Sequence, residues 1–87
     1  MKIEIRSSFT KASKKLPAHY QQKIAEIIEQ IEDVENIREI SNCKKLTGYK
    51  TAYRIKLESF RIGFFYKKGV IELTTVLHRK DIYRYFP

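Results

Sequence analysis

Residues 52–78 read AYRIKLESFRIGFFYKKGVIELTTVLH, and this stretch decides the fold. Apolar and polar residues alternate along most of it with the period of two that indicates β-strands. The pairs Glu58-Ser59 and Lys68-Gly69 interrupt the alternation, and two-residue connections of this kind favour hairpins. The stretch therefore predicts three consecutive antiparallel strands, over residues 52–57, 60–66 and 70–78.

The two turns also predict which residues share a face of the sheet. A turn at Glu58-Ser59 pairs Leu57 with Phe60, and a turn at Lys68-Gly69 pairs Ile62 with Thr75; directly opposed residues lie on the same face. The predicted core face carries Tyr53, Ile55, Leu57, Phe60, Ile62, Phe64, Ile71, Leu73 and Leu77. The opposite face, which we call the basic face, is expected to carry Arg54, Lys56, Arg61, Gly63, Phe65 and His78.

The residues before this stretch predict one strand and two helices. Residues 2–6 alternate like a strand, and Ser7 and Ser8 are suited to cap a helix that follows them. Pro17 separates that helix from a second one, whose apolar residues recur at helical spacing over residues 20–34. The whole chain, residues 1–87, is thus expected to form one α+β domain in which a helical hairpin packs on the sheet.

The net charge of +8 is distributed unevenly. Residues 1–43 contain seven Lys or Arg and seven Asp or Glu, whereas residues 44–87 contain eleven and three. Such an asymmetry suggests an anionic partner, either nucleic acid or an acidic protein segment. A solvated basic surface that only keeps the protein soluble is the alternative.

Composition excludes several other classes of protein. Cys43 is the only cysteine, so no internal disulfide can form. No apolar run is long enough for a membrane span, and the first residues do not resemble a signal peptide. We therefore expect a cytoplasmic protein. No cluster of carboxylates marks a two-metal nuclease, and we expect neither a metal nor another cofactor.

The basic face has features that suit a phosphate-containing ligand. Lys56 opposite Arg61 is an unfavourable pair of like charges unless an anion lies between them. Arg offers phosphate a bidentate fork. Gly63 leaves room for the close approach of a backbone or a base, and Phe65 is expected to stack on a base.

The last ten residues, HRKDIYRYFP (78–87), mix cations with aromatic side chains, as single-stranded RNA binding requires. Less specific interpretations remain open. The strand cations could be solvated or could bind an acidic protein partner, and His78 could simply end its strand. Tyr83, Tyr85 and Phe86 could simply pack the terminus against the sheet.

The segment KKLTGYKTAYRIKLESFRIGFFY (44–66), followed by VIELTTVLHRKDIYR (70–84), resembles the RelE/ParE superfamily of toxins. The resemblance covers essentially the whole chain. It implies a RelE-like fold, in which an N-terminal strand and a two-helix hairpin pack with a curved antiparallel sheet of about four strands. It also implies a hetero-oligomer with an antitoxin protein that covers the basic site. RelE-type members enter the ribosomal A site and cleave mRNA there without a metal, by attack of the 2′-hydroxyl group that leaves a 2′,3′-cyclic phosphate.

The resemblance also assigns roles to residues. Lys56 would deprotonate the 2′-hydroxyl or stabilise its alkoxide, Arg54 and Arg61 would hold the phosphate, and Arg79 would act on the leaving group. Tyr83, with Tyr85 as the alternative, would stack on the substrate base. His78 could instead be the general base. The further residues expected to contact RNA are Lys45, Phe65, His78, Lys80, Arg84 and Tyr85.

Three other functions compete with this one. A ParE-like toxin would inhibit DNA gyrase without cutting RNA. A binding module would use the same basic face to hold RNA without catalysis. A toxin that has lost its activity would only bind its antitoxin.

Overall fold

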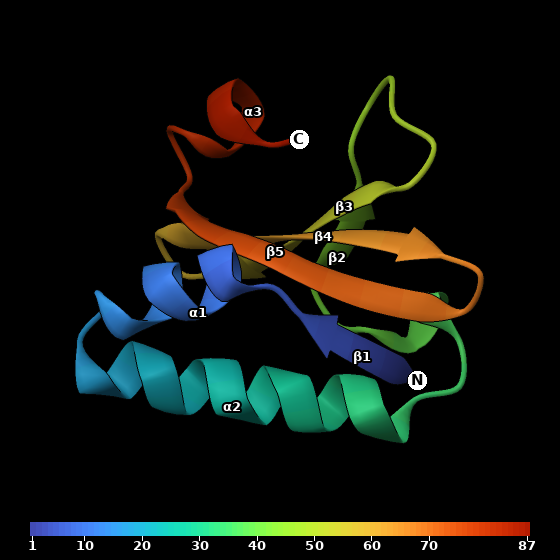
Figure 1. The fold of residues 1–87 in the computed structure, drawn as a ribbon, viewed down its shortest axis with the longest axis horizontal. Helices are drawn as coiled ribbons and strands as arrows, with labels where there is room; N and C mark the ends of the chain where they lie inside the picture. The colour runs from blue at the N-terminus through green and yellow to red at the C-terminus, as the bar shows by residue number, and fades with distance from the viewer.

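The computed structural model describes all 87 residues, which form one mixed sheet covered by helices (Figure 1). The elements in chain order are β1 (Lys2–Ile5), α1 (Ser7–Lys14), α2 (Ala18–Asp33), the 3₁₀ turn Ile37–Glu39, β2 (Cys43–Lys45), β3 (Ala52–Leu57), β4 (Phe60–Lys67), β5 (Val70–His78) and α3 (Ile82–Tyr85). The predicted helical hairpin divided at Pro17 and the three predicted strands are confirmed. No helix has the length and apolar character needed to cross a membrane.

The sheet has five strands in the order β1-β5-β4-β3-β2. Neighbouring strands are antiparallel except at one edge, where β1 runs parallel to β5. The predicted α+β architecture is therefore confirmed. The strand beyond the expected set is β2, which is only three residues long.

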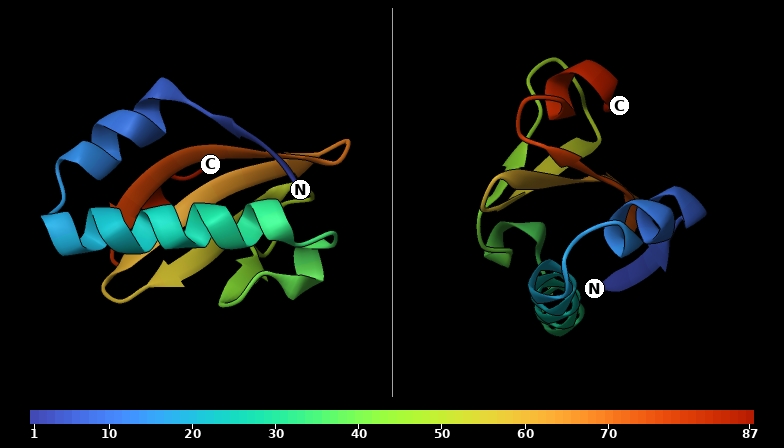
Figure 2. Two further views of the ribbon diagram at one scale, coloured as in Figure 1. Left: turned by 90° about the horizontal axis from the view of Figure 1, so that it is seen from below. Right: turned by 90° about the vertical axis from the view of Figure 1, so that its left-hand side faces the viewer.

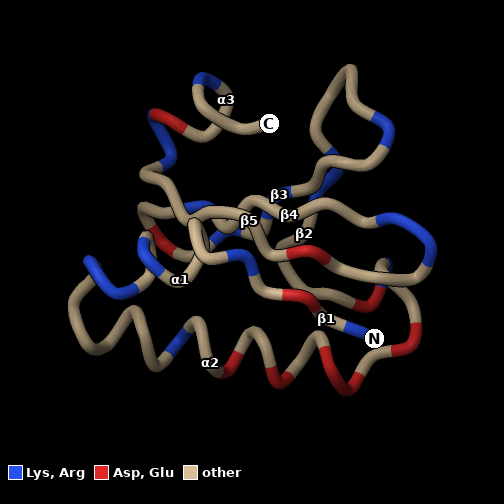
Figure 3. Tube along the Cα trace, viewed as in Figure 1, with Lys and Arg blue, Asp and Glu red and all other residues tan.

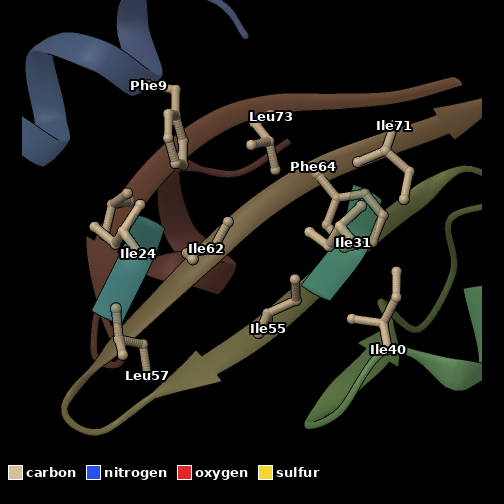
Figure 4. Close-up of a cluster of buried hydrophobic side chains, with 11 residues drawn as sticks. Phe9, Ile24, Ile31, Ile40, Ile55, Leu57, Ile62, Phe64, Ile71 and Leu73 are labelled. Atoms are coloured by element: carbon tan, nitrogen blue, oxygen red, sulfur yellow. The ribbon is translucent and has the colours of Figure 1, made fainter. Parts of the chain in front are cut away.

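Helices α1 and α2 cover one face of the sheet and bury the main core (Figure 2). Phe9 of α1 and Ile24 and Ile31 of α2 point into this core, as the helical spacing predicts. They meet strand residues such as Ile62 and Phe64, both without exposed surface (Figure 4). The helices therefore leave the opposite side of the sheet for other contacts.

The start of α1 differs from the prediction. The residue before the helix is Arg6, no side chain caps the helix, and Ser7 is its first residue. The Ser8 hydroxyl instead donates a 2.6 Å hydrogen bond to the carbonyl oxygen of Thr74 in β5. Ser8 thus connects the helix to the sheet, and the capping role predicted for the two serines is wrong.

The register of β3 with β4 is the predicted one, but that of β4 with β5 changes in the middle. Phe64 pairs with Leu73 while Gly63 pairs with Thr75, so Thr74 is an extra residue in β5, a β-bulge. Ile62 consequently pairs with Val76 and not with Thr75.

The bulge reverses the faces of all residues that follow it. Val76 is buried in the main core, and Leu77 lies opposite Arg61 on the basic face. His78 lies opposite Phe60, on the side of the helices. The predicted faces of Leu77 and His78 are therefore wrong, because successive side chains of a strand point to opposite faces and one extra residue moves those after it to the other face.

A second, smaller core lies on the basic face. It contains Leu46, Ala52, Ile82 and Phe86, all buried, with Phe65 and Leu77 packed against them. Figure 2 shows α3 on the side of the sheet away from α1 and α2, where the chain end folds back over the strands. The basic face is thus partly covered by the C-terminal residues.

Candidate functional site

Two cross-strand rows of cations run over the basic face. Lys44 lies opposite Arg54, and Lys56 lies opposite Arg61, the second pair as predicted. The structure contains two ion pairs, Arg6 with Glu72 and Lys23 with Glu58, and neither includes one of these four cations. Like charges therefore face each other across the strands without an acid to neutralise them, which is unfavourable in the absence of an anion.

Arg54 is the one charged residue of the molecule that is buried. Only 8% of the residue is exposed. Its Nη1 donates a 3.1 Å hydrogen bond to the carbonyl oxygen of Asn42, which is its one protein partner. An arginine stays charged in proteins and offers five N–H donors, so most of its donors remain available to a ligand.

Arg61 and Lys56 lie beside the turn that joins β3 to β4. Nη1 of Arg61 donates to the carbonyl oxygens of Glu58 and Phe60, each at 2.8 Å, which holds the half-buried side chain against the turn. Lys56 is exposed. The pair thus combines the planar guanidinium group of Arg61, held by hydrogen bonds, with the point charge of Lys56 on its flexible side chain.

The segment after β5 begins next to this turn. The backbone N–H of Arg79 donates a 2.8 Å hydrogen bond to the carbonyl oxygen of Ser59, so the exposed Arg79 lies near Lys56 and Arg61 in the fold. Lys80, also exposed, follows, and its N–H donates to Nδ1 of His78 at 3.2 Å. Arg79 therefore extends the basic face beyond the strands.

Two tyrosines of the C-terminal segment are mostly exposed to solvent. Tyr83 is 68% exposed and Tyr85 is 64% exposed. The guanidinium carbon of Arg84 lies 5.6 Å from the centre of the Tyr85 ring, a cation–π contact. The packing interpretation of these tyrosines is wrong, since only Phe86 of the three aromatic residues is buried. Exposed aromatic rings beside cations suit stacking on unpaired bases.

Three residues expected to contact RNA have other surroundings. Phe65 is on the basic face as predicted, but its ring packs on Phe86 with centroids 5.1 Å apart. His78 lies on the helix side and forms an edge-to-face contact with Phe60 at 5.7 Å. Lys45 lies opposite Tyr53, whose side chain contacts the main core, so the register places Lys45 on the helix side as well.

Lys44 is the site cation that the sequence reasoning missed. Because Cys43 is half-buried and packs against the main core, alternation from that residue places Lys44 on the basic face. The alternation of apolar and polar residues is too short here to predict a strand, since β2 has only three residues.

Acidic and basic residues are unevenly distributed over the molecule (Figure 3). Acidic residues follow α2, whereas cations flank the turn before α3 and the segment before β3 on the opposite side of the sheet. No group of three or more His, Cys, Asp or Glu side chains has the arrangement of a metal site. Burial raises the pKa of the Cys43 thiol to about 11, so this thiol is protonated at neutral pH and is a poor nucleophile.

Comparisons with known proteins show what this chain is similar to. No protein-family model matches the sequence. Toxin RelE3 of Methanocaldococcus jannaschii is 36% identical over 88 residues, which span 100% of both chains. A RelB-RelE antitoxin-toxin complex from Methanococcus jannaschii contains a chain with a TM-score of 0.79 and 34% identity, over 95% of this chain and 98% of that one. A chain of the intact Escherichia coli RelBE complex has the same fold, with a TM-score of 0.69 and 20% identity, over 88% of this chain and 94% of that one. Because the identity to a RelE toxin extends over the full length, the chain belongs to the RelE family of toxins.

Proposed function

We propose that this protein is the toxin of a toxin–antitoxin pair and that it cleaves mRNA on the ribosome. The observation that carries the proposal is the group of cations on the basic face, with Arg54 almost completely buried and none paired with an acid. Such a group is stable next to an anion and costly without one. Exposed aromatic rings at the same face, those of Tyr83 and Tyr85, make single-stranded RNA the anion that fits.

In the proposed reaction the 2′-hydroxyl group of one nucleotide attacks the adjacent phosphate. The 2′-oxygen bonds to phosphorus and gives up its proton, while the bond from phosphorus to the 5′-oxygen breaks and that oxygen takes up a proton. The products are a 2′,3′-cyclic phosphate and a 5′-hydroxyl end. Arg54 and Arg61 hold the phosphate and stabilise the charge that develops on its oxygens, Lys56 stabilises the 2′-alkoxide, and Arg79 stabilises the leaving oxygen.

The other residues have supporting roles in this proposal. Tyr83 stacks on a base and so fixes the nucleotide next to the scissile phosphate, with Tyr85 as the second candidate. Lys44, Lys80 and Arg84 contribute positive charge for the RNA backbone. His78 is not proposed as the base, since the bulge at Thr74 turns it to the other side of the sheet.

The same face is the proposed contact for the antitoxin. An acidic segment laid over the unpaired cations would neutralise them and exclude RNA at the same time. The proposal therefore predicts that RNA and antitoxin compete for one surface.

A cell-free translation reaction tests the proposal. The purified protein is added with and without ribosomes, and the mRNA ends are mapped and examined for the cyclic phosphate. We expect cuts only on translated mRNA, and we expect Arg61→Ala to remove them while Lys11→Ala, which changes an exposed cation on α1, does not. Intact mRNA together with blocked supercoiling by DNA gyrase would refute the proposal in favour of a ParE-like function. Intact mRNA with tight RNA binding would reduce it to a binding module.

A further inference from the structure

The C-terminal segment, residues 79–87, has one buried and one exposed side. Ile82, the first residue of the single turn α3, is fully buried, and Phe86, directly after α3, is 4% exposed; both belong to the small core. Tyr83 and Tyr85 lie on the exposed side. A single helical turn is not stable alone, so the buried pair must hold the segment in place.

Few other interactions connect this segment to the sheet. The bond from Arg79 N–H to the Ser59 carbonyl fixes its beginning. Within α3 and just after it, the backbone N–H groups bond only to Asp81 and Ile82 of the segment itself. The end of the segment is therefore held by the side chain of Phe86 and not by hydrogen bonds.

Phe86 lies directly on Gly63, in the middle of the basic face. A Cβ atom added at Gly63 would come within 2.8 to 2.9 Å of Cγ, Cδ2 and Cε2 of the ring, a separation that carbon atoms do not tolerate. Gly63 is opposite Arg54 on one side and Thr75 on the other. The glycine thus provides room for a ring of the same chain, at the position where the sequence suggested room for a ligand.

We propose that Gly63 and Phe86 are positioning residues, whose contact sets where Tyr83 stands relative to Arg54 and Arg61. This inference rests on the proposed function. Neither residue has a group that could take part in the reaction. Cleavage requires the base, the phosphate and the cations to be held within a fraction of an ångström, and a displacement of about 1 Å can cost roughly 100-fold in rate. Ile82 anchors the start of α3 in the small core, and the contact of Phe86 with Gly63 anchors its end directly beside Arg54, which lies opposite Gly63.

Three variants test the contact as a unit: Gly63→Ala, Phe86→Ala and the double variant. Gly63→Ala displaces the ring, and Phe86→Ala removes it, so each is expected to lower kcat roughly 10- to 100-fold with little change in KM. In the double variant the clash no longer exists, so its kcat should equal that of Phe86→Ala. This non-additivity is the sign of a direct contact.

Phe86→Leu and Phe9→Leu separate positioning from stability. Both shorten a buried phenylalanine, at 4% and 2% exposure, but Phe9 lies in the main core on the other side of the sheet. We expect both variants to unfold at lower temperature and only Phe86→Leu to lower kcat. A direct readout is the proton resonance of the Gly63 Hα atoms, which the Phe86 ring should shift and which should return to the ordinary range in Phe86→Ala.

The outcomes distinguish this inference from the proposed function. Cleavage by the wild type with unchanged kcat in Gly63→Ala and Phe86→Ala would overturn the positioning role and leave the proposed function intact. Equal loss of kcat in Phe86→Leu and Phe9→Leu would overturn it as well, because stability would then explain both. A wild-type protein that does not cleave would refute the proposed function and the positioning role together.

Discussion

Replacing Arg54 by methionine is predicted to abolish cleavage without unfolding the protein. Arg54 is 8% exposed and has no acidic partner, so the folded protein holds a mostly buried charge without a counter-ion. Methionine has a similar length and no charge. Replacing even a buried ion pair by apolar residues is often neutral or stabilising by about 1 to 4 kcal/mol, and Arg54 has no acidic partner whose attraction would be lost.

The variant also loses the hydrogen bond from Arg54 to Asn42, but the carbonyl oxygen of Asn42 has a second donor. Arg54 donates to the carbonyl oxygen of Asn42, and a hydrogen bond from a charged donor contributes about 1.5 to 3 kcal/mol. The same oxygen also accepts from the backbone N–H of Lys56 at 3.1 Å, so it keeps a partner in the variant. We therefore expect the free energy of unfolding to fall by no more than about 3 kcal/mol and to rise by no more than about 2.5 kcal/mol.

Urea unfolding and the translation assay together measure the two effects of Arg54→Met. Cleavage should fall by about 10² to 10³, the usual effect of removing a group that stabilises charge in the transition state. Inorganic phosphate should stabilise the wild type more than the variant, because a ligand that binds only the folded state raises its stability. A loss of more than about 3 kcal/mol in Arg54→Met would refute the reasoning, since that is the cost of breaking a stabilising buried pair and not of relieving an unpaired charge.

Three further predictions concern single side chains. In a urea titration, Ser8→Ala should lower the free energy of unfolding by about 0.5 to 1.5 kcal/mol, because the Ser8 hydroxyl donates a hydrogen bond to the Thr74 carbonyl oxygen. Ser7→Ala removes no such bond and should change the free energy of unfolding little. Burial raises the pKa of the Cys43 thiol from 9.0 to about 11, so the folded state holds this proton more tightly than the unfolded state. The protonated thiol therefore contributes stability below pH 9, and this contribution is lost as the pH rises toward 11. Cys43→Val should not show this loss in unfolding curves measured from pH 8 to 11. Tyr83→Ala should lower cleavage at least tenfold and leave the melting temperature nearly unchanged, because the side chain is mostly exposed; a large drop in melting temperature would show that it packs on the protein.

The strands and the register of β3 with β4 could be predicted because both depend on local features. The alternation of residues 52–66 and the two-residue turn at Glu58-Ser59 lead to the same pairing, and the structure has it. The opposition of Lys56 and Arg61 follows from that pairing alone.

The bulge at Thr74 could not be predicted from alternation. The sequence Thr74-Thr75 contains two β-branched polar residues, and either one fits either face of a half-buried strand. Tertiary packing makes the choice: the bulge buries Val76 in the main core and presents the Thr74 carbonyl to Ser8. The face of His78 depended on this choice, and so did its candidacy as a base.

The contact between Gly63 and Phe86 was hidden for a different reason. The sequence shows a glycine on the basic face and an aromatic residue near the chain end, 23 positions apart. Their complementarity is a matter of shape, and no periodicity reports it. The pattern of the last residues also cannot tell a packed aromatic from a free one, although the structure separates Phe86 from Tyr83 and Tyr85.

The small core on the basic face lies next to Arg54. Arg54 is opposite Gly63, on which Phe86 lies, and it shares its strand face with the buried Ala52. Apolar groups around a cation exclude water, and a lower local dielectric strengthens its attraction to a phosphate. We therefore expect the C-terminal segment to have two effects on this site, since it holds the tyrosines and places apolar side chains on the face that carries Arg54. Loss of Phe86 should weaken both, so Phe86→Ala should reduce cleavage more than Tyr83→Ala does, in the same translation assay.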